Sequence, residues 1–313
     1  MNNYFNSQYP ILMASMNRVA TLPLALACWD AGVFPSLMIP FQEKDFQTPM
    51  SPEDRRDAIN QTLLEFKKIT GNCDVVLGLN YSELDDAVTM KLIVDHQVSH
   101  VELFSTVDQT RFYHPMRYKY QKMYEPWFTK KLKTYVSIRF IERCRQLNSS
   151  TPRTAIGLHG SDGAGGTNME LTTREMFNRQ RQMTPDAVII PYGGIGTPEQ
   201  VAYYLGAGAA AVAVGTLFAA CTESPLSEAT KHTMISASAN NVVRMPDSNQ
   251  NMLPLGALTD IVESKGQSGA NRDGSLHTGI YGDGTVGHIY SGHGIQHVDR
   301  IRTVKETVEY LLG

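Results

Sequence analysis

Two glycine-containing turns lie one helical segment apart within residues 187–218, and each follows a short apolar run. Gly193 and Gly194 follow DAVIIPY, while Gly215 ends the run AAVAVG and is followed by Thr216. Because glycine lacks a Cβ, backbone N–H groups in such turns can approach an anion closely. An isolated glycine pair indicates only a tight turn, but two such turns after consecutive strands match the phosphate site of barrel enzymes. The positions expected to hold a phosphate are Gly193, Gly194, Ile195, Gly215 and Thr216.

A second group of residues that could do chemistry falls within residues 159–167, HGSDGAGGT. His159 follows an apolar run, and at the end of a strand its imidazole could act as a general base. It could equally be a hydrogen-bonded structural residue, and both interpretations stay open. Asp162 could orient His159, or it could cap the helix that follows, and the cap is the favoured interpretation.

The elements that must position these residues alternate along the chain. Short runs rich in Val, Ile and Leu are typical of strands buried on both faces, and amphipathic segments such as 22–31, 52–69, 83–96 and 197–205 separate them. This alternation predicts parallel strands with right-handed crossovers, and eight strands favour a (β/α)8 barrel. The expected strands are residues 10–15, 33–39, 74–80, 100–105, 133–138, 154–160, 186–192 and 210–215.

Two regions interrupt the alternation. Residues 107–132 are aromatic and basic, which indicates an insertion or an elaborated helix. Residues 240–298 are rich in Gly, Asn and His, and loops of this length are uncommon in compact domains unless they cover a site or are mobile. The sequence therefore predicts one domain over residues 1–313, a (β/α)8 barrel with a cap at about 240–298.

Composition restricts the classes of partner. A net charge of −3 gives no basic surface excess for nucleic acid or an anionic membrane. The 4 cysteines show no CxxC spacing, which favours reduced thiols over disulfides or a zinc site. The N-terminus lacks signal-peptide features, and no apolar run approaches the ~20 residues that span a bilayer. We expect a cytoplasmic protein that binds small molecules.

Several segments together resemble the nitronate monooxygenase (2-nitropropane dioxygenase) family of FMN enzymes. The clearest is the GGI turn, followed by a helix ending in LGA and a strand ending in GTLF. The segments YPILMASM, TLPLALACWDAG, VVLGLN, SDGAGG and SGHGIQHVDRIRTVKETVEYLL follow the family's order along the chain. The resemblance is weak across residues 107–150 and 235–290.

The resemblance implies that FMN binds across the end of the barrel. The isoalloxazine contacts would come from Met16, Asn17, Asn80, Gly165 and Gly166. In the family a histidine that acts as base or orients the substrate usually follows the glycine pair, but Thr167 stands at that position here. Because a threonine hydroxyl is too weakly basic to replace an imidazole, the base has moved, the reaction needs none, or the site is not catalytic.

The C-terminal region carries His277, His288, His293 and His297 among glycines and tyrosines. Their irregular spacing and the scarcity of nearby carboxylates argue against a metal site, and the favoured interpretation is surface or lid histidines. His293 differs because the SGHG loop resembles a family segment near the flavin. The candidate catalytic residues are His159, Asp162, Thr167 and His293.

The expected function is FMN-dependent oxidation of a small substrate, with oxygen as acceptor, as in nitronate monooxygenases. One alternative is an NAD(P)H-dependent flavin reductase that acts on a quinone or an enoyl thioester. Another is a catalytically silent barrel that binds FMN or another phosphate. NAD(P)H would bind at the end of the barrel, without a Rossmann domain of its own, and a homo-oligomer is compatible with the sequence.

Overall fold

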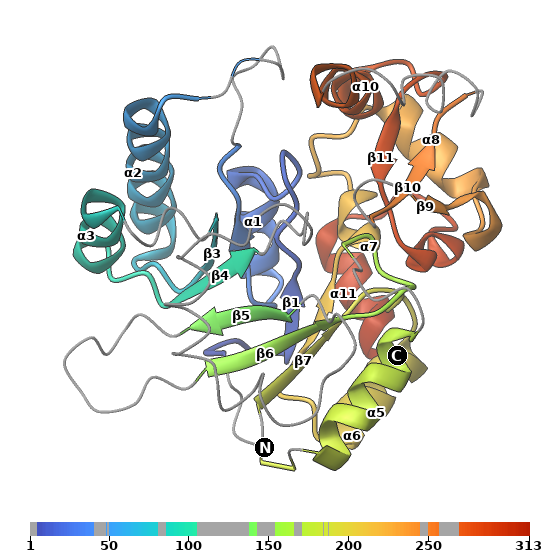
Figure 1. Cartoon of the computed structure of the whole chain (residues 1–313), viewed down its shortest axis with the longest axis horizontal. Coiled ribbons are helices and arrows are strands. Elements are labelled where there is room, and N and C mark those ends of the chain that lie inside the picture. The colour runs from blue at the N-terminus through green and yellow to red at the C-terminus, as the bar shows by residue number, and fades with distance from the viewer. Residues whose placement is uncertain are drawn as a thin grey trace.

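The computed structural model describes residues 5–40, 48, 50–80, 86–104, 138–142, 154–165, 171–183, 185–186, 188–244, 250–256 and 269–313. They form an eight-stranded sheet with helices packed outside it (Figure 1). Its strands are β1 (Ile11–Met13), β2 (Ser36–Leu37), β3 (Val76–Asn80), β4 (His100–Phe104), β5 (Ile138–Glu142), β6 (Thr154–His159), β7 (Val188–Tyr192) and β8 (Val212–Val214).

The sheet closes into a barrel at Phe34. The strand order β1-β8-β7-β6-β5-β4-β3-β2 leaves β1 and β2 as formal edges. Phe34, just before β2, forms a parallel bridge with Leu12 of β1. Phe34 N donates to Ile11 O at 2.8 Å, and Met13 N donates to Phe34 O at 3.0 Å. The predicted (β/α)8 barrel is confirmed.

One strand departs from the predicted pattern. β5 runs antiparallel to both β4 and β6, so the expectation of eight parallel strands is wrong there. An antiparallel strand can start at the end of the sheet where its predecessor stops, and it therefore needs no crossover helix. The expected strand at 133–138 overlaps β5 only at Ile138. Residues 133–137 and the predicted insertion at 107–132 lie outside the described residues.

Apolar side chains pack in two layers. Inside the barrel lie Leu12, Val76, Ile190 and Ala213, and a larger cluster fills the space between the strands and the outer helices. The barrel helices are α1 (Leu22–Asp30), α2 (Pro52–Thr70), α3 (Ala87–Asp95), α5 (Thr173–Met183), α6 (Pro198–Gly206), α7 (Thr216–Ala219) and α11 (Val304–Leu312).

A second, smaller sheet follows β8, and Figure 1 shows it grouped with two helices beside the barrel. We call the described residues from 228 to 298 the cap. The antiparallel strands of the cap are β9 (Val243–Arg244), β10 (Asn251–Pro254) and β11 (His288–Tyr290). Its helices are α8 (Glu228–Ser236), α10 (Gly269–Tyr281) and the short 3-10 turns η3 (Ala239–Asn241) and η5 (His293–His297).

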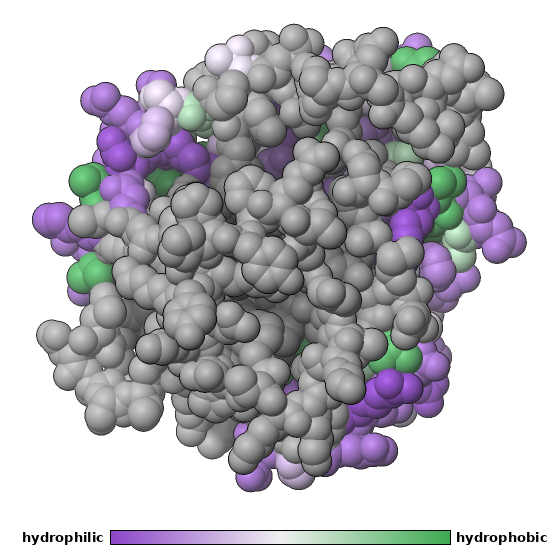
Figure 2. Space-filling view, viewed as in Figure 1, coloured by the Kyte–Doolittle hydropathy of each residue, from purple (hydrophilic) through white to green (hydrophobic). Residues whose placement is uncertain are grey.

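At the margin of the face in Figure 2, hydrophilic residues predominate and hydrophobic ones are scattered among them. Leu64 and Ile69 on α2 and Val88 and Val94 on α3 are among the exposed apolar side chains. Within the described ranges, no helix combines the length and the apolar character needed to cross a bilayer.

Candidate functional site

We call the end of the barrel at which most strands have their C-terminal ends the barrel mouth. There the turns after β6 and β7 are in contact through their backbones. Gly193 and Gly194 have φ values of +97° and +69°, where an L-residue with a Cβ is strained. A Cβ on Gly193 would lie 2.4 Å from Gly163 Cα, and one on Gly194 would lie 2.6 Å from Asp162 Oδ2. Two glycines are therefore required for this close approach.

Side chains at the start of α6 accept hydrogen bonds from the backbone amides around its N-terminus. Thr197 is the N-cap of a capping box, and Gln200 Oε1 accepts from Gly196 N at 2.7 Å and from Thr197 N at 3.1 Å. Among the described residues, the amides of Gly194 and Ile195 meet no such acceptor. The donors left for an anion at this turn thus precede the helix.

The turn after β8 lies beside the loop that follows β1 and beside the SGHG loop, residues 291–294. A Cβ on Gly215 would lie 3.5 Å from Met16 Sδ. Thr216 Oγ1 accepts from Gly292 N at 3.4 Å, which leaves the hydroxyl proton available to donate. A Cβ on Gly294 would lie 3.5 Å from Ile195 O and 3.9 Å from Thr216 Cβ. The structure brings together the residues predicted to bind phosphate.

His159 ends β6 inside the barrel. It pairs in register with Tyr192 at the end of β7, and the two rings stack with centroids 4.8 Å apart at 29°. His159 is 5% exposed and Tyr192 is fully buried. Stacking fixes the plane of the imidazole, while its role as base or as structural residue stays a prediction.

Asp162 caps a helix. Its Oδ1 accepts from Thr173 N at 2.8 Å and from Thr173 Oγ1 at 2.7 Å, at the start of α5. Thr173 Oγ1 also contacts Tyr192 O at 2.7 Å and accepts from Gly160 N at 3.1 Å. This buried hydroxyl, which the sequence analysis missed, ties the ends of β6 and β7 to the helix.

The structure describes only some of the other residues that the sequence predicts to contact the flavin. Asn17 lies in the loop after β1, and its Oδ1 is buried with no hydrogen-bond partner among the described residues. Asn80 is the last residue of β3, but its side chain is outside the described part. Gly165 lies in the turn after β6, whereas Gly166 and Thr167 are outside the described residues.

His293 belongs to the cap and reaches the mouth through its backbone. Its N–H donates to Asp162 O at 2.8 Å, and its side chain is partly exposed. His297, one turn later, packs on Gly196, where a Cβ would lie 2.7 Å from His297 Cδ2. Burial lowers the pKa of the His297 imidazole, and the nearby Glu199 carboxylate opposes that shift.

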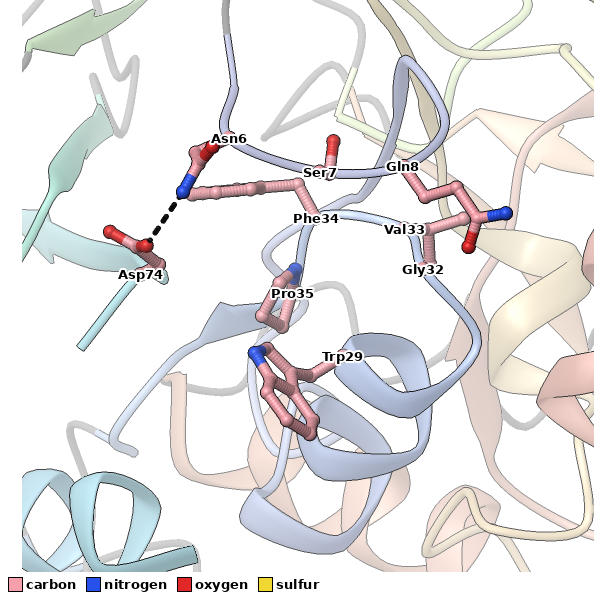
Figure 3. A pocket seen from close by; sticks show the side chains of 9 residues that line it. All are labelled: Asn6, Ser7, Gln8, Trp29, Gly32, Val33, Phe34, Pro35 and Asp74. Carbon is pink, nitrogen blue, oxygen red and sulfur yellow. Dashed lines mark hydrogen bonds between the residues drawn. The ribbon is translucent and has the colours of Figure 1, made fainter. Parts of the chain in front are cut away.

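A separate pocket of about 120 Å³ lies at the opposite end of the barrel (Figure 3). Its lining residues precede β1, β2 and β3, and Asn6 Nδ2 donates to Asp74 Oδ2 at 3.2 Å across it. Barrel enzymes carry their active sites at the C-terminal ends of the strands, so this pocket is not the candidate site.

Comparison with known proteins identifies the family. The family model described as nitronate monooxygenase matches residues 141–313, more than half of the chain. The chain belongs to the nitronate monooxygenase family. Members of this family are FMN-dependent oxidoreductases, so the chain is an enzyme of this kind and FMN is its cofactor. No curated protein matches the chain by sequence.

Solved structures share the fold. FabK from Thermotoga maritima has a TM-score of 0.69 at 21% identity, covering 98% of this chain and 93% of FabK. A nitroalkane oxidase from Streptomyces ansochromogenes has a TM-score of 0.63 at 16% identity, with coverages of 97% and 95%. The enoyl reductase domain of MlnA from Bacillus amyloliquefaciens has a TM-score of 0.60 at 13% identity, with coverages of 98% and 94%.

The residues at the barrel mouth fit FMN. Backbone donors and the Thr216 hydroxyl suit a phosphate, because an anion is stabilised by several N–H and O–H groups at once. The buried Asn17 Oδ1 still requires a donor, which a flavin ring N–H can supply. The contact of Gly163 with Gly193 keeps side chains out of this part of the mouth.

Proposed function

We propose that this enzyme oxidises a small substrate that arrives as an anion, such as a nitronate, with oxygen as acceptor. The observation that carries the proposal is the turn after β6. By the resemblance to the family, Thr167 stands where a histidine is usual, and Asp162 Oδ1 accepts from Thr173 N at the start of α5. A nitronate has already lost its C–H proton, so its oxidation needs no general base at this turn.

We assign the phosphate of FMN to the backbone amides of Gly193, Gly194, Ile195, Gly215 and Thr216. Met16, Asn17, Asn80, Gly165 and Gly166 are proposed to hold the isoalloxazine. Bound FMN supplies the redox chemistry, while the chain supplies binding, orientation and electrostatics. Of the proposed catalytic residues, His159 and His293 carry imidazoles, Asp162 holds the turn, and Thr167 can donate a hydrogen bond to an anionic substrate.

Anaerobic mixing tests the substrate class. The FMN-loaded protein is mixed separately with a nitronate, with its parent nitroalkane and with NADPH, and the visible absorbance of the flavin is followed. We expect the nitronate alone to bleach the flavin, and oxygen to restore it. Bleaching by the neutral nitroalkane would require a base and would contradict the anionic-substrate proposal. In that case loss of bleaching in His159→Ala, with FMN retained, would identify the base.

A second candidate is an NAD(P)H-dependent reductase of a quinone or an enoyl thioester. It is favoured by the likeness to FabK and to the enoyl reductase domain of MlnA. Rapid bleaching by NADPH, with no response to the nitronate, would support this candidate. Membership of an enzyme family argues against a catalytically silent barrel.

We propose that residues 1–313 act as one FMN-binding domain, in which the segment at about 240–298, the larger part of the cap, covers part of the mouth. We also propose a cytoplasmic location, which the free thiols of Cys28, Cys73 and Cys221 support. A homo-oligomer is tested by light scattering of the purified protein.

A further inference from the structure

Asn251 connects the cap to the barrel mouth. It is the first residue of β10 and is 4% exposed. Its Nδ2 donates to Ser161 O at 2.7 Å and to Gly163 O at 2.9 Å. Its backbone N donates to Ala164 O at 2.9 Å. One buried residue of the cap therefore binds three carbonyl groups of the turn after β6.

These bonds determine which way the amides of the turn point. In a planar trans peptide the C=O and the following N–H point in opposite directions, and no cis peptide bond is present among the described residues. Since Asn251 binds the carbonyls of Gly163 and Ala164, the N–H groups of Ala164 and Gly165 face away from it. Within the described part of the chain, neither N–H has an acceptor.

The same residue is linked to the turns expected to bind phosphate. Gly163, whose carbonyl Asn251 binds, packs against Gly193 so closely that a Cβ there would lie 2.4 Å from Gly163 Cα. On its other side, Asn251 O accepts from Ser291 N at 3.3 Å. Ser291 begins the SGHG loop, whose Gly292 N donates to Thr216 Oγ1. Asn251 is thus linked, by hydrogen bonds and by the contact of Gly163 with Gly193, to the turns after β6, β7 and β8.

We propose that Asn251 is a positioning residue for the flavin: it holds the turn after β6 so that the N–H groups of Ala164 and Gly165 face the cofactor. The inference rests on the proposal that FMN binds at this mouth. Asn251 itself touches no reacting atom in this role. It acts through the turn, and its loss changes how tightly and in which environment the flavin is held.

The test compares Asn251→Ala with Asn240→Ala, a matched control. Asn240 is also in the cap, but it is exposed in η3. The FMN dissociation constant is measured by fluorescence titration of the apoprotein, and the bound flavin by visible circular dichroism. We expect Asn251→Ala to weaken FMN binding about tenfold and to change the dichroism, because the carbonyls of Ser161 and Gly163 lose their donor. Asn240→Ala should match the wild type in both measurements.

Thermal unfolding of the apoproteins separates this role from a purely structural one. If Asn251→Ala melts earlier yet binds FMN with wild-type affinity and dichroism, Asn251 only anchors the cap and the proposal is overturned. Should the alanine variant not fold, Asn251→Ser keeps the backbone N–H and supplies one hydroxyl donor. Asn251→Ser is expected to weaken FMN binding severalfold, and wild-type affinity would overturn the proposal. Failure of the wild type to take up FMN would instead refute the FMN site itself.

Discussion

Replacing Gly193 by alanine tests whether the contact between the turns after β6 and β7 matters. The added methyl group meets two obstacles. The φ of +97° lies in the region that residues with a Cβ rarely adopt. The Cβ would also lie 2.4 Å from Gly163 Cα and 2.9 Å from Gly163 N, both backbone atoms that cannot rotate away.

The two obstacles contribute separately to the free energy of unfolding. Left-handed backbone costs about 1–2 kcal/mol for an alanine. Forcing a methyl group into a packed region costs about 1–3 kcal/mol, since the neighbouring backbone must shift. We therefore expect Gly193→Ala to lose about 3 kcal/mol, a fall in melting temperature of roughly 5–10 °C.

Two other glycines separate these contributions. Gly71, the C-cap of α2, has a φ of +80° with nothing within 4 Å of its Cβ position, so Gly71→Ala carries only the backbone cost of about 1–2 kcal/mol. Gly206, at the end of α6, has neither a positive φ nor a neighbour within 4 Å. Gly206→Ala should be neutral or stabilising by up to about 1 kcal/mol.

Urea unfolding of the three variants gives these free energies, and FMN titration reports on the site. The expected order of stability is Gly206→Ala, then Gly71→Ala, then Gly193→Ala, and only the last should weaken FMN binding. If Gly193→Ala loses no more than Gly71→Ala, the contact with Gly163 contributes nothing and the reasoning is refuted.

Three further predictions concern buried groups. Thr173→Val removes a fully buried hydroxyl that serves Asp162, Gly160 and Tyr192, so urea unfolding should show a loss of about 1–3 kcal/mol; an unchanged midpoint would contradict this role. Burial lowers the pKa of His96 and of His297 below their usual ~6.5, so the unfolded chain binds more protons and stability should fall as the pH drops from 7 towards 5. Replacing both histidines by glutamine should flatten that part of the pH profile, and an equally steep profile would refute the assignment. Burial raises the pKa of the Cys221 thiol to about 12, so iodoacetamide should label it only after denaturation, as peptide mass spectrometry can show.

Local signals made the segment from β7 to β8 predictable from the sequence. VIIPY predicts a buried strand, Thr197 and Pro198 mark the start of α6, and the glycines mark its flanking turns. Each of these signals acts within a few residues of its effect. Once β6 and β7 are taken as neighbours, His159 and Tyr192 fall at corresponding strand ends, although the sequence does not fix the register that stacks them.

Long-range contacts were not predictable in the same way. Asn251 binds Ser161 and Gly163 across 90 and 88 residues, and nothing in its neighbourhood distinguishes it from other polar residues of the cap. Asp162 caps α5 from 11 residues away, so only the general preference of Asp for helix N-termini pointed to that role. The direction of β5 depends on which end of the sheet the preceding chain approaches, and apolar composition does not encode that.

Proton chemistry at the mouth is limited by how each side chain is already engaged. Asp162 Oδ1 already accepts two hydrogen bonds from Thr173, at the start of α5. His159 is 5% exposed and stacked on Tyr192, which limits its contact with water. His293 is more exposed, and its backbone is fixed to Asp162 O. If the reaction consumes or releases a proton, His293 is therefore better placed than His159 to exchange that proton with solvent. An anionic substrate needs no general base at the turn after β6.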